Sequence, residues 1–289
     1  MSVHVAERPR VTLAALAEKK ALGEPIVMVT AYDFPGAQVA EAAGVDMVLV
    51  GDSGAMTVLG YDSTVPVSVD EMIMLTRAVR RGLRTPVLVA DLPFGSYEVS
   101  DEQAVATAQR FVKETGCDAV KIERGGTSVA RARAIVAAGI PVVGHVGLTP
   151  QTATALGGYR AQGRTAEAAL ALCESAVALQ AAGCSLIVVE AVPGEVTAQL
   201  MPLLDVPVIG IGAGPAADGQ VLVFHDLLGM YEGGAARFVK RYADLRTAAI
   251  EGVAAYADEV RTRAYPAPEH GYGMPAGEAE RLRELLARR

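Results

Sequence analysis

The feature that most constrains the fold is a series of eight short apolar segments spread along the chain. Most of them are near-continuous runs of Val, Ile and Leu. Such runs are typical of strands in a parallel sheet that is buried on both faces. The expected strands are residues 26–30, 47–50, 86–90, 119–123, 141–145, 186–190, 208–211 and 221–224.

Most of these segments are followed by the pattern of an amphipathic helix. The expected helices are residues 12–21, 35–44, 68–82, 100–115, 128–138, 165–182 and 195–204. This alternation predicts a (β/α)₈ TIM barrel. A doubly wound open sheet is the alternative, but no Gly-x-Gly-x-x-Gly motif follows the first strand, and the glycine run at 210–214 has the wrong spacing. We expect a single barrel domain over residues 1–264 and a helical C-terminal tail over 265–289.

The composition argues against several classes of protein. Aromatic residues make up 5% of the 289 residues and tryptophan is absent, so the core must be built from Ala, Val, Leu and Ile. The net charge is −7 without any block of like charge, which argues against nucleic-acid or membrane partners. The three cysteines have no metal-ligand spacing, and the first ten residues lack the apolar region of a signal peptide. We therefore expect reduced thiols and a cytoplasmic location.

Ionisable side chains stand at the C-terminal ends of five expected strands. In the strand over residues 119–123, Lys121 and Glu123 share one face, and Val120 and Ile122 share the other. Charges on the outer face would be buried under helices at high cost, so this pair is expected to point into the barrel mouth. The same parity aligns Asp52 with Val48 and Val50, Asp91 with Val87 and Val89, His145 with Val143, and Glu190 with Leu186 and Val188.

These strand ends converge on the face where barrel enzymes carry their active sites. Two or three neighbouring carboxylates need a cation, and an oxygen-rich set without thiolates suits Mg²⁺ or a similar hard ion. Taken singly, each residue is also compatible with a loop cap or a satisfied polar group. Taken together, the alternative to a catalytic site is a buried ion-pair network.

The strand-end segments also form an ordered series of motifs. They are Val50-Gly-Asp-Ser-Gly-Ala-Met56, Ala90-Asp-Leu-Pro-Phe-Gly95, Val120-Lys-Ile-Glu123, Gly144-His-Val-Gly-Leu-Thr-Pro-Gln151, Val189-Glu190, and Ile209-Gly-Ile-Gly-Ala-Gly214 with Asp218-Gly-Gln220. In order and spacing, from about Thr12 to about Arg261, the chain resembles the ketopantoate hydroxymethyltransferase family. The segments around His145 and Asp91 are the most specific parts of this resemblance.

The resemblance implies a reaction and a set of site residues. The reaction is transfer of a hydroxymethyl group from 5,10-methylenetetrahydrofolate to 3-methyl-2-oxobutanoate, giving 2-dehydropantoate (ketopantoate) in the first step of pantothenate biosynthesis, through an enolate stabilised by Mg²⁺. It also implies a homo-oligomer, a decamer in this family. By similarity, the metal ligands are Asp52, Asp91 and Glu123, the last direct or through water; the oxo acid contacts Asp52, Ser53, Asp91 and Lys121; and Glu190 is the proton acceptor. For His145 two roles stay open, a hydrogen bond to a ligand or carboxylate and a brace for its loop.

The sequence departs from the family pattern at one position, and two alternative functions are considered. Arg124 stands before Gly125-Gly126, where the family has glycines directly after the strand, and this puts fine specificity in question. The first rival is a lyase or mutase of the phosphoenolpyruvate mutase and isocitrate lyase superfamily, whose catalytic cysteine loop has no counterpart at a strand end here. The second rival is a catalytically inactive barrel that serves as a scaffold, which would not need so many charges in one mouth.

Overall fold

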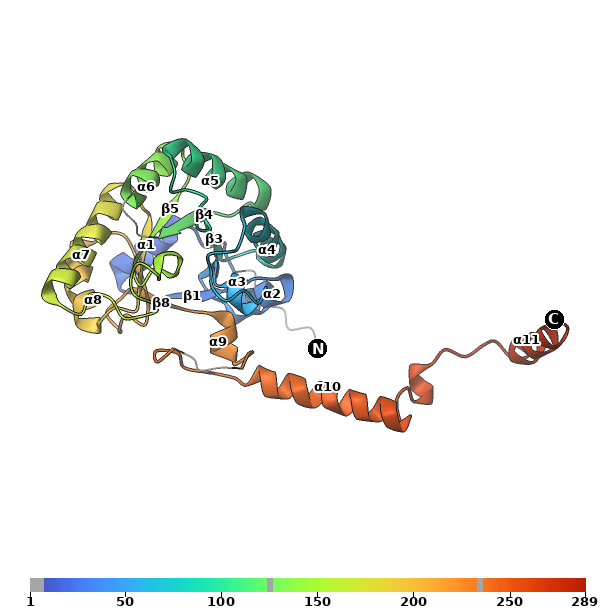
Figure 1. The fold of residues 1–289 in the computed structure, drawn as a ribbon. Helices are drawn as coiled ribbons and strands as arrows, with labels where there is room; N and C mark the ends of the chain where they lie inside the picture. Colours follow the sequence, from blue (N-terminus) through green and yellow to red (C-terminus); the bar gives the residue numbers. More distant parts are fainter. Residues whose placement is uncertain (1–7, 124–126, 233–235) are drawn as a thin grey trace. The chain divides into compact units, whose positions relative to one another are not determined.

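The strands of the chain close into a parallel barrel (Figure 1), as seen in a computed structural model that describes residues 8–123, 127–232 and 236–289. The strand order follows the sequence, and the last strand pairs with the first. The strands are β1 Ile26–Thr30, β2 Met47–Val50, β3 Val87–Asp91, β4 Ala119–Glu123, β5 Val142–Gly147, β6 Leu186–Glu190, β7 Val208–Ile211 and β8 Gly219–Leu222. The predicted (β/α)₈ barrel is confirmed.

Most helices lie around the barrel between successive strands (Figure 1), while the first precedes β1 and the last of this set follows β8. They are α1 Leu13–Leu22, α2 Phe34–Ala43, α3 Gly54–Thr57, α4 Val69–Gly82, α5 Asp101–Thr115, α6 Ser128–Ala137, α7 Ala166–Ala181, α8 Gly194–Leu200 and α9 Phe224–Leu228. Short polar side chains begin many of them by accepting a backbone N–H of the first turn. Ser68 does so in a capping box with Glu71 at the start of α4. The short helices α3 and α9 were not expected from the sequence.

The strands are apolar throughout because both of their faces are buried. In β3, Val87 and Val89 pack inside the barrel, while Leu88 and Ala90 pack under the helices. All four side chains are at most 1% exposed. The barrel interior is therefore a packed apolar core, and a binding site can form only at its ends.

The last strand begins two residues earlier than expected. β8 starts at Gly219, which pairs with Ile26 of β1 and Ile209 of β7. A Cβ at position 219 would lie 2.2 Å from the carbonyl oxygen of Ile26, so the close strand contact requires glycine. Phe224, expected in the strand, instead begins α9, and its backbone N–H donates to Thr30 Oγ1 at 2.8 Å.

Aspartates at the N-terminal end of the barrel have a structural role. Asp46, Asp118 and Asp218 each stand directly before a strand and accept a backbone N–H from a neighbouring strand. The donors are Val27 N to Asp46 at 2.9 Å, Leu88 N to Asp118 at 2.8 Å, and Val208 N to Asp218 at 2.8 Å. Basic side chains pair with the same carboxylates. These acids fix strand register, far from the mouth of the barrel.

We expect Asp118→Ala to lower stability without affecting turnover. The change leaves the N–H of the fully buried Leu88 without its acceptor, which costs about 1–3 kcal/mol. Asp118→Asn retains an acceptor oxygen and should cost less. Urea denaturation measures the free energy of unfolding of both variants. An Asp118→Ala protein as stable as the wild type would contradict this structural role.

The chain divides into two compact units, Met1–Tyr242 and Ala243–Arg289. The second unit contains α10 Leu245–Thr262, a turn at Pro268–His270 and α11 Glu278–Ala287, in the order expected for the tail. Tyr265 packs its ring against Tyr256 and His270, with centroid distances of 5.5 and 5.1 Å. The expected domain boundary after residue 264 stays a prediction, while the contacts separate the units after Tyr242.

Within the described ranges of the chain, no helix combines the length and the apolar character needed to cross a membrane. The expected cytoplasmic location stays a prediction.

Candidate active site

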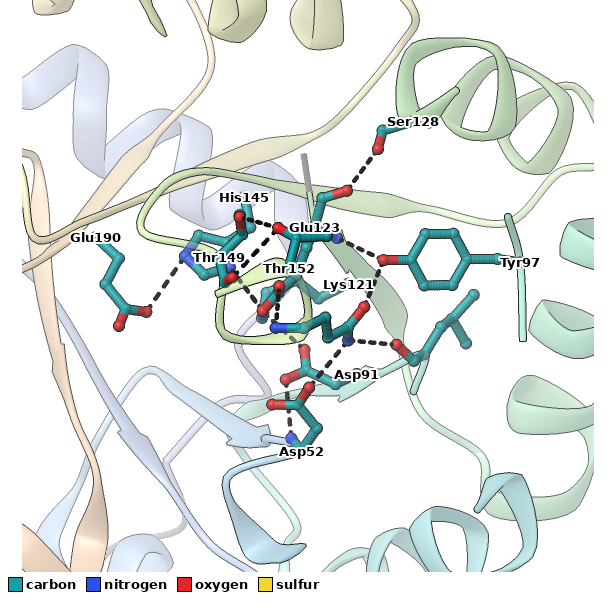
Figure 2. A network of polar contacts seen from close by, with 12 residues as sticks. Asp52, Asp91, Tyr97, Lys121, Glu123, Ser128, His145, Thr149, Thr152 and Glu190 are labelled. Atoms are coloured by element: carbon teal, nitrogen blue, oxygen red, sulfur yellow. Dashed lines mark hydrogen bonds and ion pairs between the residues drawn. The ribbon is translucent and has the colours of Figure 1, made fainter. Parts of the chain in front are cut away.

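The C-terminal ends of four strands bring their ionisable side chains together in the barrel mouth (Figure 2). Lys121 and Glu123 belong to β4, and Ala119 on the same face lies in the barrel interior. The parity argument is confirmed likewise for β3, β5 and β6, whose interior residues align with the strand-end charges. Those charges are Asp91, His145 and Glu190.

Asp52 reaches the same mouth by a route that parity did not predict. In β2, Met47 and Leu49 face the interior, while Val48 and Val50 pack under the helices. Alignment with Val48 and Val50 would therefore direct Asp52 outward, so this part of the prediction was wrong. The strand ends at Val50 and the chain turns, which returns Asp52 to the mouth. Its backbone N–H donates to Asp91 Oδ2 at 3.0 Å.

Asp91 and Lys121 form a buried ion pair. Lys121 Nζ lies 3.0 Å from Asp91 Oδ1, and both side chains are at most 4% exposed. Burial disfavours the ammonium, but the carboxylates of Asp91, Glu123 and Asp52 outweigh burial and raise the pKa of Lys121. Lys121 is therefore a fixed positive charge. Both oxygens of Asp91 have partners, Oδ1 in this ion pair and Oδ2 through the backbone N–H of Asp52.

Asp52 lies in an environment that disfavours its charged form. Burial, together with the carboxylates of Glu123 and Asp91, raises the pKa of Asp52 well above its usual value. Burial also raises the pKa of Asp91, against the opposing effect of Lys121. A positive charge near these carboxylates would relieve both effects.

His145 lies between the two ends of the charged cluster. Its Nδ1 lies 3.3 Å from Lys121 Nζ and 3.4 Å from Glu123 Oε1, and its Nε2 lies 3.3 Å from Glu190 Oε2. Burial and Lys121 disfavour its charged form, but Glu123 and Glu190 outweigh them and raise the pKa of His145. In its charged form the ring directs one N–H toward Glu123 and the other toward Glu190, whereas in one neutral tautomer Nδ1 accepts from Lys121 and the Nε2 proton points to Glu190. Of the two expected roles, the contact with a carboxylate is present.

Two uncharged residues complete the cluster and were missed from the sequence. Gln151 donates from Nε2 to Asp52 Oδ2 at 2.9 Å and from its backbone N–H to Glu123 Oε2 at 3.0 Å. Tyr97 donates to Gln151 Oε1 at 2.6 Å and accepts from Glu123 N at 3.2 Å. Gln151 ends one of the recognised motifs, so its presence was visible although its function was not.

Ser53 lies at the edge of the cluster, half-buried at the start of α3. Its Oγ is 2.8 Å from the hydroxyl of Tyr32, in the loop after β1. Burial raises the pKa of Tyr32 to about 12, so this residue stays a neutral hydrogen-bonding partner. The predicted contact of Ser53 with the oxo acid is not tested by the geometry and stays a prediction.

Glu190 is the most accessible carboxylate of the cluster, with 17% of its side chain exposed. Backbone hydrogen bonds hold residue 190 and the residue that follows it. The carbonyl accepts from Leu148 N at 2.8 Å, and the next residue, Ala191, has φ 49°, a left-handed conformation that costs a non-glycine residue energy. Ala191 N donates to Ile211 O at 2.8 Å, which holds this turn in place.

We expect Gly147→Ala to displace Glu190. Gly147 has φ 98°, and an added Cβ would lie 2.2 Å from the carbonyl oxygen of Glu190. Gly158→Ala is a matched control, because φ is 100° but nothing lies within 4 Å of the added atom. Turnover by the Gly147 variant should fall more than turnover by the control, while both lose stability. Equal turnover in the two variants would exclude positioning of Glu190 by this contact.

The donor set of the mouth fits a hard divalent cation. Four carboxylates face one ammonium and one imidazole, which leaves an excess of negative charge. In the described parts of the chain, no group of three His, Cys, Asp or Glu side chains is arranged to hold a metal ion. Mg²⁺ needs only one or two protein carboxylates and completes its shell with water and substrate. The adjacent Asp52 and Asp91 supply such a pair.

Comparison with known proteins decides the family. A family model described as ketopantoate hydroxymethyltransferase matches residues 10–268. The chain belongs to this family. A 3-methyl-2-oxobutanoate hydroxymethyltransferase of Moorella thermoacetica is 52% identical, covering 93% of this chain and all of that protein. A mitochondrial relative with the same enzyme name from Arabidopsis thaliana is 49% identical, covering 94% and 80%. This ketopantoate hydroxymethyltransferase family member is therefore an enzyme, as predicted.

Solved structures with low sequence identity share the fold of this ketopantoate hydroxymethyltransferase family member. A phosphonopyruvate hydrolase in complex with oxalate and Mg²⁺ has a TM-score of 0.57 at 14% identity, covering 96% of this chain and 99% of that chain. A 2,3-dimethylmalate lyase has a TM-score of 0.54 at 16% identity, covering 92% and 90%.

Arg124, the departure from the family pattern, lies outside the described residues.

Proposed function

We propose that the enzyme transfers a hydroxymethyl group from 5,10-methylenetetrahydrofolate to 3-methyl-2-oxobutanoate, giving ketopantoate for pantothenate synthesis. The observation that carries the proposal is the cluster of Asp52, Asp91, Lys121 and Glu190 in the mouth of a barrel of this family. The names of the curated relatives support the same acceptor. The folate donor and the course of the reaction belong to the proposal.

In the proposed site, Asp52 and Asp91 would hold Mg²⁺, with Glu123 as a direct or water-bridged third ligand. When bound, the ion would supply Lewis acidity to the oxo acid. Lys121 adds a permanent positive charge against the oxyanion that develops when the substrate loses its C3 proton. Ser53 lies beside Asp52 and is the proposed further contact for the oxo acid.

Glu190 is the proposed general base. Its carboxylate accepts the C3 proton, and the electron pair of the C–H bond moves toward the carbonyl to give the enolate. His145, whose Nε2 lies 3.3 Å from Glu190 Oε2, orients this carboxylate and also contacts Lys121 and Glu123. His145 is therefore a positioning residue in this proposal.

The enolate carbon then forms a bond with the one-carbon unit supplied by the folate. The transferred carbon is bonded to two folate nitrogens, and both C–N bonds break: one is replaced by the bond to the enolate carbon and the other by the hydroxyl oxygen of water. The two nitrogens take up the C3 proton and one proton of that water. The residues described above account for the acceptor half of the reaction. They leave the binding of the folate ring system to other parts of the barrel mouth.

The alternative function, a lyase or mutase, depends on a catalytic cysteine. The three cysteines of the chain do not supply one. Cys117, Cys173 and Cys184 are all buried outside the cluster. Burial raises the pKa of Cys117 to about 11 and that of Cys184 to about 12, which suppresses the reactive thiolate. The structural neighbours with mutase and lyase names share the fold without lending this chain their reactions.

The test of the proposal is product formation. Enzyme, 3-methyl-2-oxobutanoate and 5,10-methylenetetrahydrofolate should yield ketopantoate by mass spectrometry with Mg²⁺ and none with excess EDTA. Cleavage of the oxo acid without folate would instead support a lyase, and absence of any turnover would support an inactive scaffold. The expected homo-decamer is part of the same proposal, and analytical ultracentrifugation measures it.

A further inference from the structure

Gln151 connects parts of the mouth that come from different strands. It lies in the short turn Pro150–Thr152 after β5 and is 5% exposed. Its amide contacts Asp52, which follows β2, and its backbone N–H contacts Glu123 at the end of β4. Tyr97, in the loop after β3, holds the other end of the amide. One glutamine therefore links the loops of three strands to the end of a fourth.

The orientation of this amide is fixed by its partners. The Tyr97 hydroxyl accepts from Glu123 N, so its own proton is donated to Gln151 Oε1. The two protons on Nε2 are donated to Asp52 Oδ2 at 2.9 Å and to the carbonyl oxygen of Leu92 at 3.0 Å. A flipped amide would place its oxygen against both of these acceptors. Gln151 therefore presents only donors to Asp52.

Gln151 contacts one oxygen of each carboxylate and does not contact the other. Gln151 occupies Asp52 Oδ2 and Glu123 Oε2, and the described residues form no hydrogen bond to Asp52 Oδ1. Glu123 Oε1 faces His145 Nδ1 at 3.4 Å. A carboxylate held through one oxygen loses less freedom when the other oxygen binds an ion.

We propose that Gln151, with its amide fixed by Tyr97, is a positioning residue that pre-orients Asp52 and Glu123 and thereby sets the affinity of the mouth for a divalent cation. The inference rests on the proposed function, because it concerns the ion of that site. Gln151 acts through the two carboxylates without replacing either of them. Its effect should therefore appear in cation affinity measured without substrate.

The experiment measures Mn²⁺ binding to the full chain by the electron paramagnetic resonance signal of free Mn²⁺. Gln151→Leu should weaken binding by about 10–100-fold, the usual effect of losing a group that orients metal ligands. Tyr97→Phe should weaken it less, because the amide remains but can rotate. The double variant should bind much as Gln151→Leu does, since Tyr97 acts through the same amide.

Gln180→Leu is the matched control. Gln180 Oε1 accepts from Asp205 N at 2.7 Å and Val206 N at 3.1 Å, away from the mouth. It should lower the melting temperature and leave Mn²⁺ affinity unchanged. If Gln151→Leu does not fold, Tyr97→Phe tests the inference alone.

Unchanged Mn²⁺ affinity in the folded Gln151 and Tyr97 variants would overturn the inference, and so would effects that add in the double variant. Asp91→Asn separates this failure from failure of the proposed site. If Asp91→Asn abolishes binding while Gln151→Leu does not affect it, only the inference falls. If Asp91→Asn also binds normally, the proposed cation site is wrong and the inference falls with it.

Discussion

Replacement of Glu190 by glutamine is expected to slow exchange of the substrate C3 proton by about 10²–10⁴-fold, the usual contribution of a general base. Glutamine retains the shape and hydrogen bonding of the side chain but does not accept the proton. The backbone contacts that hold residue 190, through Leu148 and Ala191, do not involve the carboxylate and should survive. Proton NMR of 3-methyl-2-oxobutanoate in D₂O with Mg²⁺ measures the rate.

Binding of the oxo acid to Glu190→Gln should barely change, since Lys121 and the proposed ion hold the substrate. Glu195→Gln is the matched control, because this exposed glutamate of α8 lies outside the cluster. An unchanged exchange rate in Glu190→Gln would remove the assignment. His145, whose Nε2 lies 3.3 Å from Glu190 Oε2, would then be the next candidate base.

Replacement of Asp91 by asparagine is expected to reduce ketopantoate formation by roughly 10³-fold or more, because it removes a proposed metal ligand together with the charge partner of Lys121. Breaking a buried ion pair costs about 3–5 kcal/mol, and the remaining contact of Lys121 with His145 should reduce this cost. Calorimetric titration with Mg²⁺ and the oxo acid should show no binding. Asp52→Asn should behave in the same way.

Asp118→Asn provides the control for this substitution. Asp118 also pairs with basic side chains, but at the N-terminal end of β4. Its replacement should leave Mg²⁺ binding and turnover intact. Normal Mg²⁺ titrations in both Asp52→Asn and Asp91→Asn would refute their assignment as ligands.

The sequence predicted most of the fold because buried parallel strands leave a strong pattern. The charges of β4 were the most informative residues, since Lys121 and Glu123 tolerate only an inward orientation next to Val120 and Ile122. The same reasoning failed for Asp52, because strand periodicity ends where the chain turns. It also missed the start of β8, since Gly219 carries no apolar side chain and is there for close contact with β1.

The site was predictable in its charged members and not in its neutral ones. Gln151 and Tyr97 have ordinary residue types for a loop, and only the folded chain brings them between Asp52 and Glu123. Asp91 and Asp118 are the same residue type, and only their positions at opposite ends of strands separate them. Both adjoin a strand, but Asp91 ends β3 in the mouth, whereas Asp118 precedes β4 and binds the backbone of β3.

The most direct test of the central claim is C3 proton exchange by the wild-type enzyme without folate. Enolisation needs only the base and a cation in the carboxylate mouth, so 3-methyl-2-oxobutanoate in D₂O should lose its C3 proton signal with Mg²⁺ and keep it with excess EDTA. Exchange that proceeds equally with EDTA, or no exchange with Mg²⁺, would contradict the account.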